Sequence, residues 1–364
     1  MRLTLFLDHQ CDLRCTYCYN GEKFVAPMPF DTAKTAVDLV LSRHAPLQQV
    51  GFFGGEPLLR LPLVKDIARY VRERTAGAEK PVQLVCTTNG THLDAATAAW
   101  LKAEDVFVGL SIDGCAPAHD ACRRRADGAS SHEAVVAGLR AALDAGLGVR
   151  TLTVVDPANV QWMAESFDFL YDLGVRSLSF NLNYEGGWDE PARAAFTAAL
   201  DALTDRYVAA WRRGAPFRLS LFDGKIVTHL KSGFSCSDRC DFGCEELAVS
   251  PSGALYPCDR LVGEDDRADV VIGTVWDDVD VVRRDALVHR KNEVLAECGE
   301  CELLPRCMHW CGCVNYAMTG DVGEVSGLLC WFERAIVAAA DRAAETLYAE
   351  ANPAFVKRFY RSVL

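Results

Sequence analysis

The sequence lacks the excess of basic residues that nucleic-acid backbones require, and it lacks a long apolar run. Its 364 residues include 38 lysines and arginines against 50 acidic residues, so the net charge is −12. The basic clusters are short, at 123–125 and near the C-terminus at 357–361. The apolar opening at 3–7 ends at Asp8 and is too short for a signal peptide or a membrane span. We therefore expect a cytoplasmic protein that binds neither nucleic acid nor membrane.

Cysteine is scarce in the middle of the chain and abundant in two other regions. Of 16 cysteines, three lie in the first 18 residues and ten lie between Cys236 and Cys330. Without a secretion signal, such clusters more often bind metal or perform redox chemistry than form disulfides. Half of the residues are apolar, which is enough for one large domain with a smaller one beside it.

The N-terminal cysteines, Cys11, Cys15 and Cys18, form a Cys-x3-Cys-x2-Cys run. Three thiolates can hold a cubane iron–sulfur cluster and leave its fourth iron open. Zinc is the alternative, but it prefers four ligands and no histidine follows at zinc-finger spacing. With Tyr17 before the third cysteine, the run resembles the signature of the radical S-adenosylmethionine (SAM) superfamily. The resemblance implies that SAM binds the open iron and is cleaved reductively to a 5′-deoxyadenosyl radical, which abstracts hydrogen from a substrate.

Short β-rich segments alternate with amphipathic helical patterns over residues 1–225. We predict strands at 3–7, 50–53, 82–87, 106–112, 149–155 and 177–181, and helices at 31–45, 62–75, 93–103, 132–146, 160–173 and 190–213. This alternation predicts an α/β fold of parallel strands joined by crossover helices. Six such units resemble the partial (β/α)6 TIM-like barrel of radical SAM enzymes. Barrels of this kind place their active sites at the carboxyl ends of the strands.

The second predicted strand ends in Gly54, Gly55, Glu56 and Pro57. Glycines let a backbone approach a ligand closely, and Glu56 supplies a carboxylate. The run resembles the family's GGEP motif, whose backbone and acid receive the SAM amino group. An ordinary turn is the alternative reading of these four residues.

Further SAM contacts are implied by the resemblance and by polar residues at the ends of later strands. They are Thr88, Asn89, Ser111, Asp113, Arg123 and Leu182. Ser111 is implied to contact the ribose region, and Arg123, in a His-Asp-x-x-Arg run, to pair with the SAM carboxylate. Asp113 is either a ligand or a loop-capping carboxylate. Leu182 is implied to touch adenine, but it also fits an ordinary barrel-core position.

The C-terminal cysteines resemble the seven-cysteine SPASM pattern over residues 236–333, which implies two auxiliary [4Fe–4S] clusters. The family's interleaved arrangement assigns the outer cluster to Cys298, Cys301, Cys307 and Cys330, and it assigns Cys258 and Cys311 to the inner one. Three thiols compete for the two remaining inner places, namely Cys236, Cys240 and Cys244, of which we favour Cys236 with Cys240. Cys115, Cys122 and Cys313 receive no role. A zinc ribbon is the alternative for the whole region.

These assignments predict a barrel at 1–225, a cysteine-rich SPASM domain at 226–335 and a C-terminal helix at 336–364. Asp259 follows the inner-cluster ligand Cys258. In anaerobic sulfatase maturases, an aspartate in this position is implicated as the base that deprotonates the substrate side chain. A structural cap or an ion pair with Arg260 is the alternative for Asp259.

SPASM proteins mostly modify peptides or proteins, so the resemblance implies such a substrate and a low-potential electron donor, a flavodoxin or ferredoxin. The sequence opens on the first predicted strand, so we expect either a separate leader-recognition protein or binding without one. The leading hypothesis is oxidative modification of a ribosomally made peptide, giving a thioether or carbon–carbon cross-link. The alternatives are formylglycine formation in a sulfatase and dehydrogenation of a small alcohol. A non-catalytic iron–sulfur electron carrier would not need the GGEP and His-Asp-x-x-Arg motifs.

Overall fold

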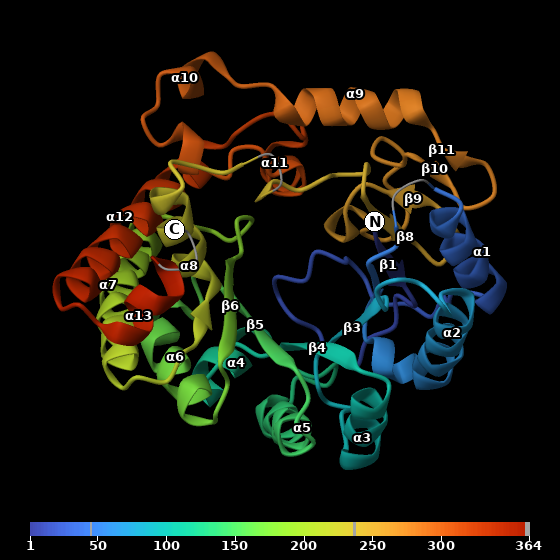
Figure 1. Ribbon diagram of the computed structural model, residues 1–364, viewed down its shortest axis with the longest axis horizontal. Helices are drawn as coiled ribbons and strands as arrows, with labels where there is room; N and C mark the ends of the chain where they lie inside the picture. Colours follow the sequence, from blue (N-terminus) through green and yellow to red (C-terminus); the bar gives the residue numbers. More distant parts are fainter. Residues whose placement is uncertain (44–45, 236–237, 361–364) are drawn as a thin grey trace. The chain divides into compact units, whose positions relative to one another are not determined.

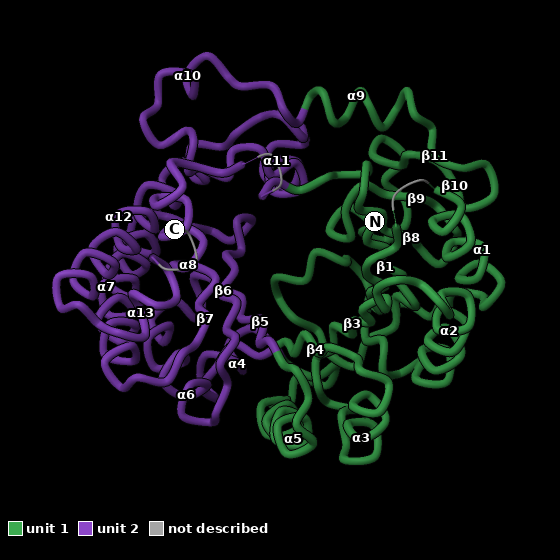
Figure 2. Tube along the Cα trace, viewed as in Figure 1, with its two compact units in different colours: residues 1–111, 124–149, 240–290 green, residues 112–123, 150–239, 291–364 purple. Residues whose placement is uncertain are grey.

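The computed structural model describes residues 1–43, 46–235 and 238–360 (Figure 1). The chain forms two compact units, which Figure 2 colours separately. Unit 1 comprises Met1–Ser111, Arg124–Val149 and Cys240–Arg290. Unit 2 comprises Ile112–Arg123, Arg150–Arg239 and Lys291–Leu364. Among the described helices, none is both long and apolar enough to cross a lipid bilayer.

The strands of unit 1 lie in the order β4-β3-β2-β1-β8-β9. Their bounds are β1 Arg2–Phe6, β2 Gln49–Phe53, β3 Gln83–Thr88, β4 Val106–Ser111, β8 Glu246–Val249 and β9 Leu255–Tyr256. Neighbouring strands from β4 to β8 are parallel, and β9 is antiparallel to β8. A separate antiparallel pair is formed by β10 Gly273–Thr274 and β11 Asp278–Val279. The carboxyl ends of β1 to β4 therefore lie along one edge of this sheet.

Helices connect the strands from β1 to β4 (Figure 1), namely α1 Phe30–Leu41, η1 Pro57–Arg60, α2 Leu61–Arg74 and α3 Ala95–Ala103. The other helices of unit 1 are α5 His132–Asp144, η4 Asp259–Leu261 and α9 Val281–Asn292, whose last two residues belong to unit 2. Asp94 caps α3 by accepting the Thr97 N–H at 2.7 Å, which satisfies an otherwise unpaired donor of the first turn. The side chains of Leu5, Phe52 and Leu84 are fully buried in the core. Burial of each contributes about 1.5–3 kcal/mol to the stability of the fold.

The strands of unit 2 lie in the order β7-β6-β5 and are parallel. Its elements are α4 Ala116–Cys122, β5 Val149–Val155, η2 Val160–Trp162, α6 Met163–Asp172, β6 Ser177–Leu182, α7 Glu190–Arg212, β7 Arg218–Leu219, α8 Ser220–Leu230, α10 Ala296–Gly299, η5 Leu304–Arg306, α11 Gly312–Thr319, α12 Gly327–Ala349 and α13 Pro353–Phe359. Helix α12 packs against α7 and α8. Trp211 lies in an aromatic core with Phe217 at 5.1 Å and Phe355 at 5.5 Å between ring centroids.

The predicted α/β fold with parallel strands is confirmed, and each of the six predicted strands is present with ends within one residue of the expected ones. Strands β7 and β8 and helix α4 were not predicted, because short segments carry too little periodicity to be recognised. At the C-terminus, α12 starts at Gly327 and a second helix, α13, starts at Pro353. The compact units cut across the predicted domain boundaries, which remain a sequence-based proposal.

Candidate functional site

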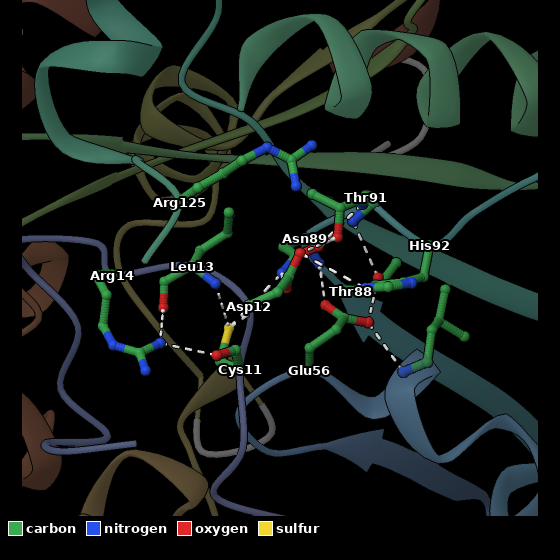
Figure 3. Close-up of polar contacts among 12 residues, drawn as sticks. Cys11, Asp12, Leu13, Arg14, Glu56, Thr88, Asn89, Thr91, His92 and Arg125 are labelled. Carbon is green, nitrogen blue, oxygen red and sulfur yellow. Dashed lines mark hydrogen bonds and ion pairs between the residues drawn. The ribbon is translucent and has the colours of Figure 1, made fainter. Parts of the chain in front are cut away.

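The loop that follows β1 carries Cys11, Cys15 and Cys18, all partly buried. The Cys18 N–H donates to the Cys15 carbonyl at 3.2 Å, which closes a turn between these two cysteines. The Leu13 N–H donates to Cys11 Sγ at 3.4 Å, and Asn89 Nδ2 donates to the same sulfur at 3.7 Å (Figure 3). Because N–H groups aimed at sulfur stabilise its anionic form, this donor set fits an iron–sulfur cluster held by three thiolates.

Burial raises the pKa of the Cys11 thiol to about 12, although the Leu13 N–H bond opposes the shift. At neutral pH this thiol is therefore protonated unless a metal takes the place of the proton. Binding of a metal to the Cys11 sulfur is thus coupled to release of the thiol proton.

Asp8 anchors the start of the same loop and is itself buried. Its carboxylate forms an ion pair with Arg60 at 2.6 Å, and it accepts the N–H groups of Gln10 at 3.1 Å and Ala26 at 2.8 Å. A cation and two backbone donors satisfy the buried charge. Sequence reasoning treated Asp8 only as the end of an apolar run, since its partners lie far along the chain.

Gly54 and Gly55 approach the backbone of the cysteine loop. A Cβ on Gly54, whose φ is +135°, would lie 2.6 Å from the Asp8 carbonyl oxygen, and one on Gly55 would lie 2.2 Å from that of Gln10. The Gly55 N–H donates to Asp8 O at 2.8 Å, and the Glu56 N–H donates to Gln10 O at 2.9 Å. The close approach expected toward a ligand is therefore observed toward another loop, because the two backbones pair with no space for side chains.

Glu56 is fully buried, and three donors within the protein bind its carboxylate (Figure 3). They are Thr88 Oγ1 at 2.7 Å, the Asn89 N–H at 2.7 Å and the Leu58 N–H at 2.9 Å. Burial raises the pKa of Glu56 to about 7, against the effect of these three bonds. The acid of the GGEP run thus ties the end of β2 to the end of β3, and Pro57 follows it as the buried first residue of η1.

The raised pKa of Glu56 predicts a pH dependence of stability. The carboxyl titrates near 4.5 when unfolded and near 7 when folded, so the folded protein holds the extra proton in this window. Its contribution to the free energy of unfolding is therefore full below about pH 4.5 and is lost as pH rises through 7. Relative to Glu56→Gln, the free energy of unfolding of the wild-type protein should fall by about 3 kcal/mol over this pH range. Denaturant unfolding at a series of pH values measures this difference. The exposed Glu73→Gln variant is the control; parallel curves for wild type and Glu56→Gln would contradict the prediction.

Asn89 also connects the cysteine loop to a polar cluster around Asp12. Asn89 Nδ2 donates to Asp12 Oδ1 at 2.8 Å, and the Thr91 hydroxyl donates to Asp12 Oδ2 at 2.7 Å. His92 Nε2 lies 3.6 Å from the same carboxylate. Asp12, Thr91 and His92 were not predicted as site residues, because only the fold brings the β1 and β3 loops together.

The cysteine loop is held on its other side by the segment around the three consecutive arginines. The Arg14 N–H donates to the Arg124 carbonyl at 2.7 Å, and Leu13 forms a β-bridge with Arg125. The exposed Arg14 side chain donates to the Cys11 carbonyl at 2.8 Å. Predicted contacts Tyr17 and Ser111 are partly exposed, Tyr17 in this loop and Ser111 at the end of β4.

The other three predicted SAM contacts lie in unit 2. Asp113 is buried, accepts the Val154 N–H at 3.0 Å, and donates its own N–H to His119 Nδ1 at 3.4 Å. Arg123 is buried at the end of α4, where its N–H donates to the His119 carbonyl at 2.7 Å. Leu182 is the buried last residue of β6. The carboxylate of Asp113 therefore accepts a backbone N–H of β5, and its two expected roles stay predictions.

The predicted inner-cluster thiols divide between the units. In unit 1, Cys258 is buried, Cys240 is partly buried and lies 3.7 Å from Glu246 Oε2, and Cys244 is exposed. Cys236 lies outside the described residues. In unit 2, Cys311 Sγ lies 3.7 Å from Cys313 Sγ at the start of α11.

Tyr19 connects the first cysteine loop with the loop of Cys258. Its ring stacks on Phe53 at 6.3 Å between centroids, and the Arg260 guanidinium lies 4.7 Å from the ring centroid. Burial raises the pKa of Tyr19, and the charges of Asp259, Arg260, Cys18 and Cys258 all act on it. Asp259 Oδ1 lies 3.4 Å from Cys258 Sγ and accepts the Arg260 N–H at 3.1 Å. Sequence reasoning missed Tyr19, whose only signal was its place directly after Cys18.

The four predicted outer-cluster thiols belong to unit 2. They are Cys298, Cys301, Cys307 and Cys330, all partly buried. Burial and the charges of Cys330 and Cys301 raise the pKa of Cys298, and burial raises that of Cys307 to about 12 with Cys330 adding to the shift. Cys330 therefore acts electrostatically on both Cys298 and Cys307, and Cys301 acts on Cys298.

Two ion pairs that the sequence did not reveal hold the Cys307 segment. Lys225 of α8 pairs with Glu333 of α12 at 2.6 Å, and both side chains are buried. Glu333 also accepts the Met308 N–H at 2.8 Å. Arg306 forms a two-pronged pair with Asp341, at 2.8 and 2.6 Å. These contacts join α8, α12 and the thiol-bearing segment.

Comparisons with known proteins agree with this geometry. A family model for the Radical SAM superfamily matches residues 8–170. A GTP 3′,8-cyclase from Streptomyces coelicolor is 36% identical over 282 residues, covering 70% of this chain and 76% of that protein. A serine-type anaerobic sulfatase-maturating enzyme from Klebsiella aerogenes is 25% identical over 320 residues, covering 83% of this chain and 76% of that protein. A PqqA peptide cyclase from Streptomyces rochei is 28% identical over 69% and 67%, respectively.

An uncharacterized protein from Methanocaldococcus jannaschii is 32% identical over 180 residues, which is 50% of this chain and 62% of that protein. Among solved structures, native anSMEcpe with bound AdoMet has a TM-score of 0.82 at 21% identity, covering 95% of this chain and 98% of that one. The same protein with AdoMet and the Cp18Cys peptide scores 0.81 at 21% identity, covering 96% and 99%. Streptococcus suis SuiB bound to its precursor peptide SuiA scores 0.61 at 18% identity, covering 90% and 75%.

The fold is thus the partial TIM-like barrel of anSMEcpe, together with a cysteine-rich C-terminal region. Family membership and the SAM-bound structures of the same fold support SAM and a [4Fe–4S] cluster as cofactors. From the family model and the similarity to whole enzymes, the chain belongs to the radical SAM superfamily of enzymes.

Proposed function

We propose that this protein uses SAM to modify a ribosomally made peptide oxidatively, forming a thioether or carbon–carbon cross-link. The observation that carries the proposal is the contact between the Tyr19 ring and the Arg260 guanidinium. Tyr19 follows the first set of thiols, and the neighbouring Arg260 and Asp259 follow the thiol of Cys258. A radical-generating loop beside a second thiol-bearing loop suits a reaction in which a substrate radical must lose an electron nearby.

Cys11, Cys15 and Cys18 would hold the SAM-binding cluster, which with SAM supplies the electron and the 5′-deoxyadenosyl radical. Asn89 and the Leu13 N–H would stabilise the Cys11 thiolate. Glu56 would keep the two strand-end loops in register, while its neighbours in the GGEP run accept the SAM amino group through their carbonyl groups. Arg123, Asp113, Ser111 and Leu182 keep their expected SAM contacts in this proposal.

The thiols assigned to the inner and outer sets would hold two auxiliary clusters. A cross-link would remove a hydrogen atom, one electron and one proton from the substrate; SAM and the clusters would supply the radical and redox chemistry, and a base of this chain would take the proton. Asp259 is the carboxylate that would take this proton, because it is partly exposed beside Cys258. The Arg260 N–H bond and the stack of Arg260 on Tyr19 would hold it in place.

Relatives support a peptide substrate. A relative by sequence is named as a peptide cyclase, and two proteins of similar fold have been solved with peptides bound. The electron would come from a flavodoxin or ferredoxin. Thiolate clusters need a reducing compartment, which favours the cytoplasm.

Formylglycine formation in a sulfatase is the second candidate. It is favoured by the TM-score of 0.82 to anSMEcpe over nearly the whole of both chains and by the named sulfatase-maturating relatives. Asp259 would serve as the base in this reaction as well, so the residues described above do not separate the two substrates.

The test is anaerobic incubation of reconstituted protein with SAM, dithionite and either of two peptides. One is any short Cys-rich, precursor-like peptide encoded beside the gene, and the other is a sulfatase-derived peptide with Cys or Ser at the modified position. The proposal predicts 5′-deoxyadenosine together with loss of two hydrogens from the first peptide, located by tandem mass spectrometry. An aldehyde on the sulfatase peptide, trapped with a hydrazide, would instead establish the second candidate.

A further inference from the structure

Arg334 contacts two of the outer-cluster thiols at once. It lies on α12 one turn after Cys330, and its side chain is exposed. Its Nε donates to Cys330 Sγ at 3.4 Å, and its Nη2 donates to Cys301 Sγ at 3.5 Å. Residues four apart on a helix lie on the same face, so Cys330 and Arg334 point the same way. The guanidinium thus joins α12 to the separate segment that carries Cys301.

The partners of Arg334 differ from those of other arginines in this unit. Arg306 pairs with the carboxylate of Asp341 on α12. Arg342, which is itself on α12, pairs with the carboxylate of Asp201. In the described part of the chain, the hydrogen-bond partners of Arg334 are the two sulfurs. The thiols raise the pKa of Arg334, with the Cys330 bond as the largest cause and the charges of Cys330, Cys301 and Cys307 acting in the same direction. Its positive charge is therefore directed at the group of four thiols.

We propose that Arg334 raises the reduction potential of the outer auxiliary cluster, so that this cluster accepts an electron more readily than it would without the arginine. The inference rests on the proposed function, which assigns Cys298, Cys301, Cys307 and Cys330 to that cluster. Hydrogen bonds to the sulfurs and the net charge around a cluster are established determinants of its potential. Reduction adds one negative charge to a centre that already carries four thiolates. A cation that donates two N–H···S bonds stabilises the reduced form more than the oxidised form.

Other charges near the four thiols do not replace this effect. Glu297 acts on Cys298 in the opposite direction, because a carboxylate disfavours added negative charge. Glu333 also disfavours negative charge on Cys307, and Lys225, which pairs with Glu333 at 2.6 Å, acts on Cys307 in the opposite direction, so the charges of this pair oppose each other. A guanidinium presents its N–H groups in a fixed planar fork, whereas a lysine ammonium is a compact point charge on a flexible stem, so lysine is not equivalent at this position.

The test is a redox titration that requires neither SAM cleavage nor a peptide. Full-length protein with Cys11, Cys15 and Cys18 changed to Ala would be reconstituted, so that the auxiliary clusters alone give the electron paramagnetic resonance signal. In Arg334→Gln, we expect the ratio of reduced to oxidised outer cluster at a fixed potential to fall roughly tenfold, which is about 59 mV for a one-electron couple. Arg334→Lys should shift by less, since it keeps the charge and loses the second bond.

Arg342→Gln is the matched control, because it removes an exposed arginine from the same helix without touching a thiol. Its titration should superimpose on that of the parent. Unchanged potentials in Arg334→Gln with full iron content would overturn the proposal. Where Arg334→Gln loses iron, Arg334→Lys decides: a lower potential supports the proposal and an equal one refutes it. Failure to find a peptide product would refute the proposed function and leave this titration unaffected.

Discussion

Reconstituted Cys15→Ala protein is expected to form no 5′-deoxyadenosine above background, whereas wild-type protein is expected to form it from SAM. Cys15 is the middle thiol of the β1 loop, and its carbonyl accepts the Cys18 N–H at 3.2 Å. Without its sulfur, two thiolates remain, too few to hold three irons of a cubane while leaving the fourth open. The measurements are 5′-deoxyadenosine by chromatography and iron and labile sulfide per chain. Iron should fall by the content of one cluster.

Cys86→Ala is the control for this prediction. Cys86 is fully buried in β3, so removing its sulfur leaves a small cavity at a cost of about 1 kcal/mol. Iron content and SAM cleavage should be retained in this variant. Wild-type cleavage by Cys15→Ala would contradict the assignment of the cluster to this loop.

Asp259→Asn is expected to spare SAM cleavage and to lower substrate conversion by about 10²–10⁴-fold, the usual contribution of a general base. Asparagine keeps the shape of aspartate and can still accept the Arg260 N–H, but it cannot take a proton at neutral pH. The contacts with Cys258 and Arg260 should persist, so the loop should remain folded. The variant would therefore release 5′-deoxyadenosine without forming product in proportion.

The readout is the ratio of modified peptide to 5′-deoxyadenosine, measured in the same reaction. Asp266→Asn provides the control, since Asp266 is an exposed acid only a few residues along the same segment and should leave the ratio unchanged. Equal loss of cleavage and conversion in Asp259→Asn would indicate a structural role, the alternative that its place beside Arg260 allows.

Much of the fold and the chemistry could be predicted from local patterns. The six strands were recognised because each is a short run of apolar, β-branched or aromatic residues between helical patterns. The cysteine runs were recognised because cluster ligands within one loop have fixed spacing. By contrast, the roles of Gly54 and Gly55 were predicted toward a ligand, and the structure places the Asp8 and Gln10 carbonyls where their side chains would be.

The missed residues share one property: their partners lie far away in sequence. Asp8 pairs with Arg60, Lys225 with Glu333, and Tyr19 with Arg260. No periodicity or local motif encodes such pairs, because each partner sits in a segment with its own pattern. Arg334 has one partner of each kind. Cys330 is one helical turn away in the sequence, whereas Cys301 lies on a distant segment.

The sequence by itself determined the parallel α/β scaffold and the superfamily, and it predicted the cluster ligands, because strand periodicity and ligand spacing are local properties of a chain. The tertiary structure alone decided how those groups are held and tuned. It directed the Glu56 carboxylate to donors on another strand, placed Tyr19 between two thiol-bearing loops and brought the Arg334 guanidinium onto two sulfurs. Hydrogen bonding and electrostatics act through distances in space, which only the folded chain defines.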